Sequence, residues 1–270
     1  MIQRAAVVVP AANEERTISM CLSSILAARS QLYRSPMSVP VQVFVVLDSC
    51  HDATSELAGA FADVHLVPIA ARSVGAARRA GVHAALTAPH RASELWIANT
   101  DADSEVPADW LTYMIAEARR DTHLVLGTVL PGPGLHPGLR TEWLSNHQLR
   151  DNHPHVHGAN FGIRGDAYLA LGGWQPARSG EDVDLAHRAA TAGHLRISRP
   201  ASIPVITSVR RFGRAPHGFS SYLRALGAGG DPPSKGTDLQ EAHDPPCGQR
   251  EHPHFEETSA TRTKRVAPAR

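Results

Sequence analysis

Residues 5–15 read Ala-Ala-Val-Val-Val-Pro-Ala-Ala-Asn-Glu-Glu, a continuous apolar run with a polar end that contains a proline. Such a short, β-branched run predicts a buried strand over residues 5–9, and apolar residues at helical spacing follow over residues 17–28. The same alternation continues, with strands expected at 41–47, 65–67, 95–98 and 123–129, and helices at 53–61, 74–86 and from Pro107. It predicts an α/β fold, a Rossmann-like, mainly parallel sheet flanked by helices.

The composition excludes several classes of protein. The chain has 270 residues, and its 27 basic and 26 acidic side chains give a formal net charge of +1. A general nucleic-acid binder would carry a basic excess, so no nucleic-acid partner is expected. The three cysteines lack the spacing of a disulfide framework or a metal site, which favours a cytoplasmic location. No signal peptide or membrane-spanning segment is expected, although peripheral contact with the inner face of a membrane is compatible with this sequence.

The chain changes character near Gly227. From Ala228 onward, proline, glycine and charged residues dominate, and Phe255 is the only aromatic residue. Such a segment buries too little apolar surface to offset the entropy of ordering it. We therefore expect a folded domain over residues 1–227 and a disordered tail over residues 228–270.

Polar residues follow the first two expected strands, at the edge where parallel sheets bind ligands. Asn13, Glu14 and Glu15 suit either a helix cap and first turn or a contact to a ribose hydroxyl. Asp48 ends the second strand and is a candidate acceptor for a base or ribose, whereas Asp52 is expected to cap the next helix.

Two carboxylates follow the fourth strand, in the run Asp101-Ala102-Asp103. Carboxylates this close repel each other unless a cation lies between them. Hard oxygen ligands select Mg²⁺ or Mn²⁺, which commonly bridge protein carboxylates to substrate phosphates. The alternative interpretation is an Asp-rich turn that leads into the helix at Pro107.

Two further runs lie in the second half of the chain. Small residues at 158–160 (Gly-Ala-Asn) permit close approach to a ligand, and residues 180–182 (Gly-Glu-Asp) open a helix. Glu181 and Asp182 could stabilise the helix dipole, and a carboxylate at a pocket mouth is also a natural general base.

These runs resemble family 2 glycosyltransferases, which have the nucleotide-sugar-binding fold called GT-A. The matching segments occur in family order between about residues 5 and 226: 7–15, 45–54, 75–81, 101–103, 158–161 with 172–174, and 180–182. The resemblance implies transfer of a sugar from a nucleotide-diphosphate sugar to a hydroxyl acceptor, which could be a sugar, a lipid-linked molecule or a small molecule.

The resemblance also implies roles for individual residues. Those that would contact the nucleotide sugar are Pro10, Ala11, Glu14, Asp48, Arg72, Arg78, Asp101, Ala102 and Asn160. Arg72 or Arg78 would approach the base or diphosphate, and Gly158, Ala159 and Asn160 would border the donor sugar and acceptor.

Mn²⁺ or Mg²⁺ is the cofactor that the resemblance implies, held by Asp101 and Asp103 with Asp103 favoured as direct ligand. Asp182 would be the catalytic base of an inverting displacement, with Glu181 touching the acceptor, and Trp174 would wall the acceptor side.

Histidines form a cluster at His147, His153, His155 and His157. A flexible acceptor-side loop is favoured over a zinc site, because alternate residues of an extended segment need not converge on one ion. His217 is a candidate metal ligand, since some GT-A enzymes supply a histidine from this late region, and a solvated loop histidine is the alternative. The arginines of residues 210–214 could instead cover the diphosphate when a loop closes.

Two other functions compete with glycosyl transfer. A nucleotidyltransferase acting on sugar phosphates would normally show a glycine-rich, basic loop after the first strand, and residues 10–15 contain neither glycine nor a basic residue. A non-catalytic nucleotide-sugar-binding protein is disfavoured by the intact Asp101, Asp103 and Asp182.

Overall fold

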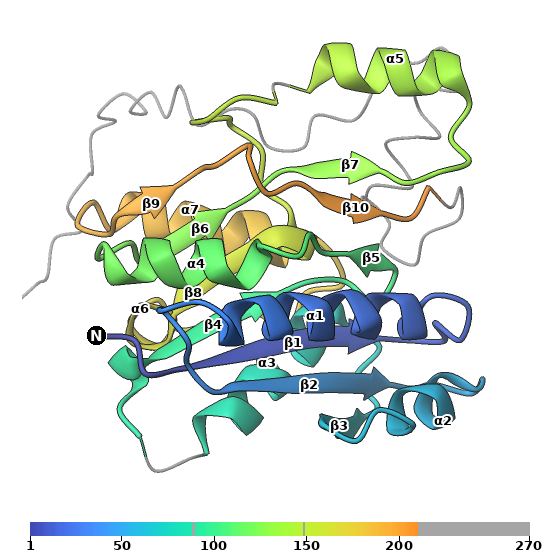
Figure 1. Cartoon of the computed structure of the whole chain (residues 1–270), viewed down its shortest axis with the longest axis horizontal. Helices are drawn as coiled ribbons and strands as arrows, with labels where there is room; N and C mark the ends of the chain where they lie inside the picture. Colours follow the sequence, from blue (N-terminus) through green and yellow to red (C-terminus); the bar gives the residue numbers. More distant parts are fainter. Residues whose placement is uncertain (88–89, 148, 210–270) are drawn as a thin grey trace, which may run out of the picture. The chain divides into compact units, whose positions relative to one another are not determined.

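The computed structural model of the chain describes residues 1–87, 90–147 and 149–209 (Figure 1). The expected domain boundary at residue 227 and the tail at 228–270 lie outside this part of the chain, as do His217 and the arginines at 210–214.

A seven-stranded sheet forms the centre of the fold, in the order β3-β2-β1-β4-β8-β6-β9. Its strands are β1 (Arg4–Ala11), β2 (Val41–Asp48), β3 (Val64–Ile69), β4 (Leu95–Asn99), β6 (Leu124–Leu126), β8 (Phe161–Arg164) and β9 (Ile197–Ser198). Strands β1, β2, β3 and β4 run parallel to one another, as do β6 and β9, and β8 is antiparallel to β4 and β6. The expected mainly parallel α/β sheet is therefore confirmed.

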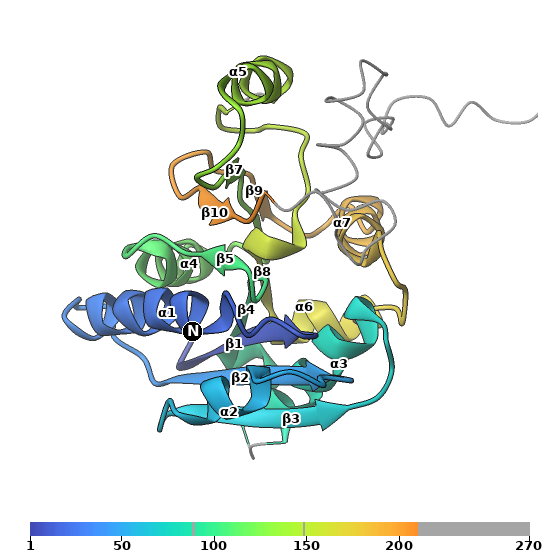
Figure 2. The same cartoon turned by 90° about the vertical axis from the view of Figure 1, so that its right-hand side faces the viewer.

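Helices cover both faces of this sheet, and one core lies on each face. They are α1 (Ile18–Tyr33), α2 (Thr54–Gly59), α3 (Val74–Leu86), α4 (Trp110–Arg119), α6 (Gly165–Ala170) and α7 (Glu181–Thr191), whereas α5 (Pro137–Asn146) lies apart from this sheet (Figure 1). Figure 2 shows α1 and α4 on one side of the sheet and α3, α6 and α7 on the other. Successive β1 side chains enter alternate cores, Val7 and Val9 the first and Ala6 and Val8 the second. Burial on both faces explains why this strand is apolar throughout.

The strand order places a binding crevice beside β1. This strand pairs with β2 on one side and with β4 on the other, so the connections that leave β1 and β3 run to opposite sides. In open α/β sheets, ligands bind beyond the carboxyl ends of the strands at such a switch point. The loop after Ala11 and the turn after Asn99 therefore flank the expected site.

A second, three-stranded sheet has the order β5-β10-β7, with β5 (Ser104–Glu105), β10 (Val205–Thr207) and β7 (Val129–Pro131). The single strand expected at 123–129 is thus wrong, because β6 and β7 belong to different sheets. The break falls at Gly127, whose N–H donates to the Asn160 carbonyl at 2.9 Å. A Cβ at Gly127 would lie 2.2 Å from the Asn160 side-chain nitrogen, so only glycine fits.

Asn160 joins this second sheet to the rest of the fold. Its side chain is fully buried, and its nitrogen donates to the carbonyls of Thr128 and Ile203, both at 2.8 Å. Its oxygen accepts from the Trp110 indole N–H at 2.9 Å. Both amide donors are therefore used inside the protein. The expected contact of the Asn160 side chain with a sugar is replaced by a structural role.

The Asn160→Asp variant tests this role. A carboxylate there keeps the acceptor for Trp110 but faces two carbonyls without a donor, so we expect unfolding free energy to fall by about 3 kcal/mol. Urea denaturation measures the loss, and Asn146→Asp, at an exposed position, is the matched control. A loss in Asn160→Asp no larger than in the control would contradict the structural role.

Candidate active site

The loops after β1 and β2 are joined by hydrogen bonds. The Asn13 side-chain oxygen accepts from the His51 N–H at 2.7 Å, and the Glu14 N–H donates to the Thr54 hydroxyl at 2.6 Å. The following helix begins only at Ile18 and has no acidic residue in its first turn. Asn13 therefore joins the two loops and does not cap this helix, whereas Glu14 also contacts the helix start, where its carbonyl accepts from the Ile18 N–H at 2.9 Å.

Asp52 and Glu15 extend this junction. Asp52 accepts from the Glu15 N–H at 3.1 Å, and Glu15 accepts from the Ala53 N–H at 3.2 Å. Asp52 also accepts from the N–H of Thr54, the first residue of α2, at 3.0 Å, but the N-cap of this helix is Ala53, so Asp52 lies one residue before the expected cap position. The polar groups after β1 and β2 thus form one connected rim at the carboxyl edge of the sheet.

Asp48 at the end of β2 is buried and holds the loop that leads into α3. Its carboxylate accepts from the N–H groups of Ala71 (2.9 Å), Arg72 (2.8 Å) and Ser73 (2.8 Å). Arg72 has a left-handed φ of 50°, and the Ser73 hydroxyl accepts from Ala76 N–H as the N-cap of α3. Asp48 therefore fixes the start of the helix that carries Arg78.

The Asp101–Asp103 turn connects the two sheets, because β4 ends at Asn99 and β5 begins at Ser104. The Asp101 carbonyl accepts from the Ser104 N–H at 3.0 Å and from the Cys21 thiol at 3.3 Å. Burial, with the nearby Asp103 and Asp101 carboxylates, raises the pKa of the Cys21 thiol. The thiol therefore stays protonated and remains a donor to this turn.

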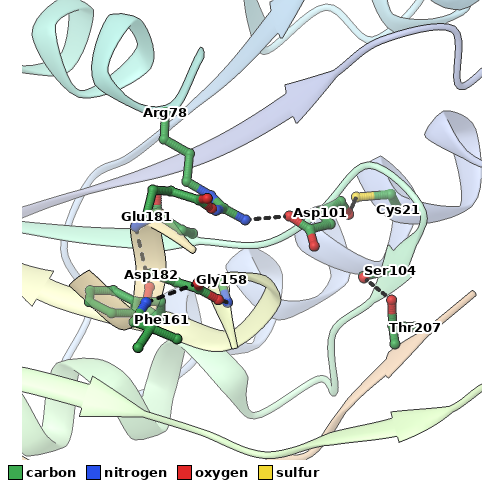
Figure 3. Close-up of polar contacts among 11 residues, drawn as sticks. Cys21, Arg78, Asp101, Ser104, Gly158, Phe161, Glu181, Asp182 and Thr207 are labelled. Carbon is green, nitrogen blue, oxygen red and sulfur yellow. Dashed lines mark hydrogen bonds and ion pairs between the residues drawn. The ribbon is translucent and has the colours of Figure 1, made fainter. Parts of the chain in front are cut away.

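Arg78 lies between two carboxylates that come from different elements (Figure 3). One terminal nitrogen donates to Asp101 at 2.6 Å, and the other forms a close ion pair with Glu181, the first residue of α7. The Arg78 and Glu181 side chains are buried, whereas Asp101 is partly exposed. Arg78 was expected near a base or diphosphate, and here its charge is directed at these two protein carboxylates.

Gly158 and Trp174 enclose the guanidinium. A Cβ at Gly158 would lie 2.3–2.5 Å from the terminal atoms of Arg78, so the missing side chain makes room for the arginine. The Trp174 ring is fully buried, with its centroid 5.4 Å from the central guanidinium carbon, in cation–π range. The expectation that Trp174 walls the acceptor side is wrong, because no part of it reaches the surface.

Glu181 and Asp182 begin α7 in different environments. Burial raises the pKa of Glu181, with Asp182 acting in the same direction and Arg78 opposing it. Asp182 is partly exposed, and its carboxylate accepts from the N–H groups of Gly158 (2.8 Å) and Val183 (2.9 Å). Glu181 was expected to touch the acceptor, but it faces inward to Arg78. Asp182 is the more accessible of the two carboxylates.

The described residues contain no group of three or more His, Cys, Asp or Glu side chains that could hold a metal ion. Asp101 and Asp103 nevertheless place two carboxylates in one turn, and Mg²⁺ is typically bound by one or two carboxylates together with substrate phosphates. This donor set fits an ion shared with a bound diphosphate. His217, the third expected ligand, lies outside the described residues.

The clustered histidines stack face to face. The Trp143 and His147 rings lie 3.8 Å apart, His147 and His155 4.8 Å apart, and His155 and His157 6.0 Å apart. Burial lowers the pKa of His155 to about 4, and the neighbouring His147, His153 and Arg199 act in the same direction. His155 thus packs as a neutral ring within this stack of aromatic rings, which does not support the zinc alternative.

The structure thus brings some expected residues together and separates others. Arg78, Asp101, Glu181 and Asp182 form one cluster with the backbone of Gly158, whereas Asn160 and Trp174 lie in the core. Sequence reasoning missed the backbone N–H of Gly158 as a partner of Asp182. The glycine itself was the available signal, because a residue without a side chain lets other groups come close to its backbone.

The fold and the cluster of carboxylates at its switch point define a GT-A-like α/β protein. A family model described as glycosyl transferase family 2 matches residues 6–169, and the chain belongs to this family. A search of the curated proteins gives no match.

Solved glycosyltransferase structures share the fold at low identity. The S. aureus TarS 1–349 structure with UDP-GlcNAc is 14% identical, with a TM-score of 0.61 over 83% of this chain and 65% of that one. The mannosyltransferase PcManGT from Pyrobaculum calidifontis, with GDP-Man and Mn²⁺, is 21% identical, with a TM-score of 0.57 over 83% and 61%. This chain thus corresponds to less than two thirds of either structure's length.

Within the described residues, no helix has both the length and the apolar character needed to cross a membrane. The cytoplasmic location expected from the sequence stays a prediction.

The low pKa of His155 predicts a pH-dependent stability. The folded state favours the neutral ring, so protonation of the unfolded chain lowers stability as the pH falls from 6.5 toward 4. Thermal unfolding between pH 4 and 7.5 should show this fall, and His155→Gln should reduce it. The exposed His90→Gln is the control. Equal slopes in wild type and His155→Gln would contradict the stacked, neutral arrangement.

Proposed function

We propose that this protein is a glycosyltransferase that moves a sugar from a nucleotide-diphosphate sugar to a hydroxyl acceptor. The observation that carries the proposal is the convergence of Asp101, from the end of β4, and Asp182, from the start of α7, beside the buried Arg78. This cluster lies at the switch point of the sheet, where α/β proteins bind nucleotides. Membership in glycosyl transferase family 2 supports the same reaction.

The loops after the first three strands would bind the nucleotide. Pro10 and Ala11 end β1, Glu14 lies in the loop that follows, and Arg72 lies in the loop that Asp48 fixes. Because Asp48 already accepts three backbone N–H groups, we propose that it shapes the base pocket mainly by holding this loop. The neighbours solved with UDP, UDP-GlcNAc and GDP-Man support a nucleotide-sugar donor.

Mn²⁺ or Mg²⁺ would be held by Asp103 and Asp101, with Ala102 between them, and His217 is a further candidate ligand. A bound divalent cation stabilises the charge that develops on the diphosphate leaving group. The neighbouring PcManGT and the Mycobacterium tuberculosis glucosyl-3-phosphoglycerate synthase are solved with Mn²⁺, which supports this assignment.

Asp182 would act as the base. Two backbone N–H groups fix the orientation of its carboxylate, and its partial exposure leaves it accessible to an acceptor hydroxyl. As the acceptor oxygen forms its bond to the anomeric carbon, Asp182 takes the hydroxyl proton, and the bond from that carbon to the diphosphate oxygen breaks. A single displacement of this kind inverts the anomeric configuration.

The nucleotidyltransferase and non-catalytic alternatives make different predictions in one assay. The assay gives the protein Mn²⁺ or Mg²⁺ with either a panel of nucleotide sugars, including UDP-GlcNAc and GDP-Man, or a nucleoside triphosphate together with a sugar phosphate. A glycosyltransferase releases nucleoside diphosphate from one donor, a nucleotidyltransferase releases pyrophosphate from a nucleoside triphosphate, and a binding protein releases neither.

Asp103→Ala is expected to abolish metal-dependent release of nucleoside diphosphate. The variant lacks the carboxylate that would bind the cation, so turnover should fall by about 100-fold or more. The exposed Asp109→Ala changes a nearby acid outside the turn and should retain activity. If Asp103→Ala turns over at the wild-type rate, the metal assignment is wrong.

Asp182→Asn is expected to retain donor binding and lose transfer. The amide oxygen can still accept from Gly158, but it cannot take a proton, so kcat should fall by about 100-fold to 10,000-fold. Calorimetry measures donor binding and product release measures kcat. Asp184→Asn, two residues along the same helix and exposed, is the matched control. Wild-type transfer by Asp182→Asn would overturn its assignment as base.

A further inference from the structure

We propose that Arg78 is a positioning residue, whose guanidinium holds Asp101 on the donor side and Glu181 on the acceptor side at the same time. This inference rests on the proposed glycosyl transfer and deepens it. In this proposal, Arg78 sets the distance between the turn that would bind the donor diphosphate and the helix that carries the base.

The two contacts use different atoms of one rigid group. One terminal nitrogen pairs with Asp101 at 2.6 Å and the other pairs with Glu181 (Figure 3). A guanidinium is planar and presents its donors in a fixed fork, whereas a lysine ammonium is a single point charge. The separation of the two carboxylates is therefore set by the fork, and a lysine would supply the charge without the span.

The guanidinium has little freedom to move. Its side chain is 3% exposed, the Gly158 backbone lies against it, and the Trp174 ring lies 5.4 Å away. The Nε atom is buried without a hydrogen-bond partner among the described residues. Leaving a buried donor unpaired costs free energy. The two terminal nitrogens of Arg78 are therefore paired with carboxylates, while its Nε is left unpaired. This is the arrangement expected of a guanidinium whose position is set by Asp101 and Glu181.

Asp182 is connected to the guanidinium of Arg78 in two ways. It follows Glu181 directly in the first turn of α7, and its carboxylate accepts from the N–H of Gly158, the residue packed on the guanidinium. A displacement of Arg78 would therefore move the first turn of α7 through both contacts. Small displacements at a reacting centre are costly, since about 1 Å can reduce turnover 100-fold.

The charge of Arg78 has a second, separable effect. The positive guanidinium is paired with Asp101, one of the carboxylates proposed to bind the divalent cation. Because the guanidinium and the cation are both positive, they repel each other. Removing the charge should strengthen cation binding, while removing the fork should weaken turnover. A merely structural arginine would not produce opposite changes in these two quantities.

The experiment compares Arg78→Lys and Arg78→Gln with Arg79→Lys and Arg79→Gln, which alter the exposed neighbour on the same helix. Mn²⁺ binding to each protein is titrated in the absence of donor, using the paramagnetic resonance signal of free Mn²⁺. Release of nucleoside diphosphate gives kcat with donor and acceptor present, and thermal unfolding reports whether each variant is folded.

We expect Arg78→Gln to bind Mn²⁺ about tenfold more tightly, as expected when one neighbouring charge is removed, and to lose about 100-fold in kcat. Arg78→Lys should keep Mn²⁺ affinity within about threefold of wild type and still lose about 100-fold in kcat, because the charge remains and the fork does not. Both Arg79 variants should match wild type.

Gly158→Ala provides an independent test that keeps Arg78 intact. Its Cβ would overlap the guanidinium, so kcat should fall, and combining it with Arg78→Lys should add little further loss. Near-wild-type kcat in Arg78→Lys, unchanged or weaker Mn²⁺ binding in Arg78→Gln, or fully additive losses would each overturn the inference. If wild type turns over no donor but the Mn²⁺ pattern holds, the proposed function fails while the link between Arg78 and Asp101 stands.

Discussion

The ion pairs of Arg78 are the constraint around which this end of the molecule is arranged. A buried guanidinium is costly to desolvate and is tolerated only where its charge is met. Here Asp101 and Glu181 meet it from two different elements, and Trp174 adds the face of an aromatic ring. Burial raises the pKa of Glu181, and the charge of Arg78 opposes that rise. The start of α7 and the turn after β4 are thereby held together by charge.

Other residues are constrained by this arrangement. Gly158 must lack a side chain because the guanidinium occupies that space, and Asp48 must hold the loop before α3 because that helix carries Arg78. On the far side of the sheet, Cys21 on α1 donates to the Asp101 carbonyl and stays protonated through its raised pKa. Helices on both faces of the sheet thus contact the turn at Asp101, α1 through Cys21 and α3 through Arg78.

The sequence predicted the large elements well because their signals are local. The apolar run of β1 is buried on both faces, and α3 was expected at the residues where it occurs. The second sheet was not predicted, since its strands are two or three residues long and their pairings connect segments far apart in the chain. Asn160 was misread for the same reason, because its partners Thr128 and Ile203 are distant in sequence. The order of the motifs identified Arg78, Asp101 and Asp182, but only packing could reveal that Arg78 faces two carboxylates and that Trp174 lies behind it.

The turn from Thr100 to Asp103 belongs to two hydrogen-bonded sheets at once. Thr100 N–H donates to the Val8 carbonyl on the β1 side, while Ser104 pairs with Thr207 in β10 through both the backbone register and a 3.0 Å contact between hydroxyls. Strand side chains alternate between faces, so a shift of one residue in the pairing of β5 with β10 would exchange the faces to which Ser104 and Glu105 point. The number of residues in this turn is therefore under as much constraint as their identity. Insertions that diversify such a protein should accumulate in other loops and leave this turn at constant length.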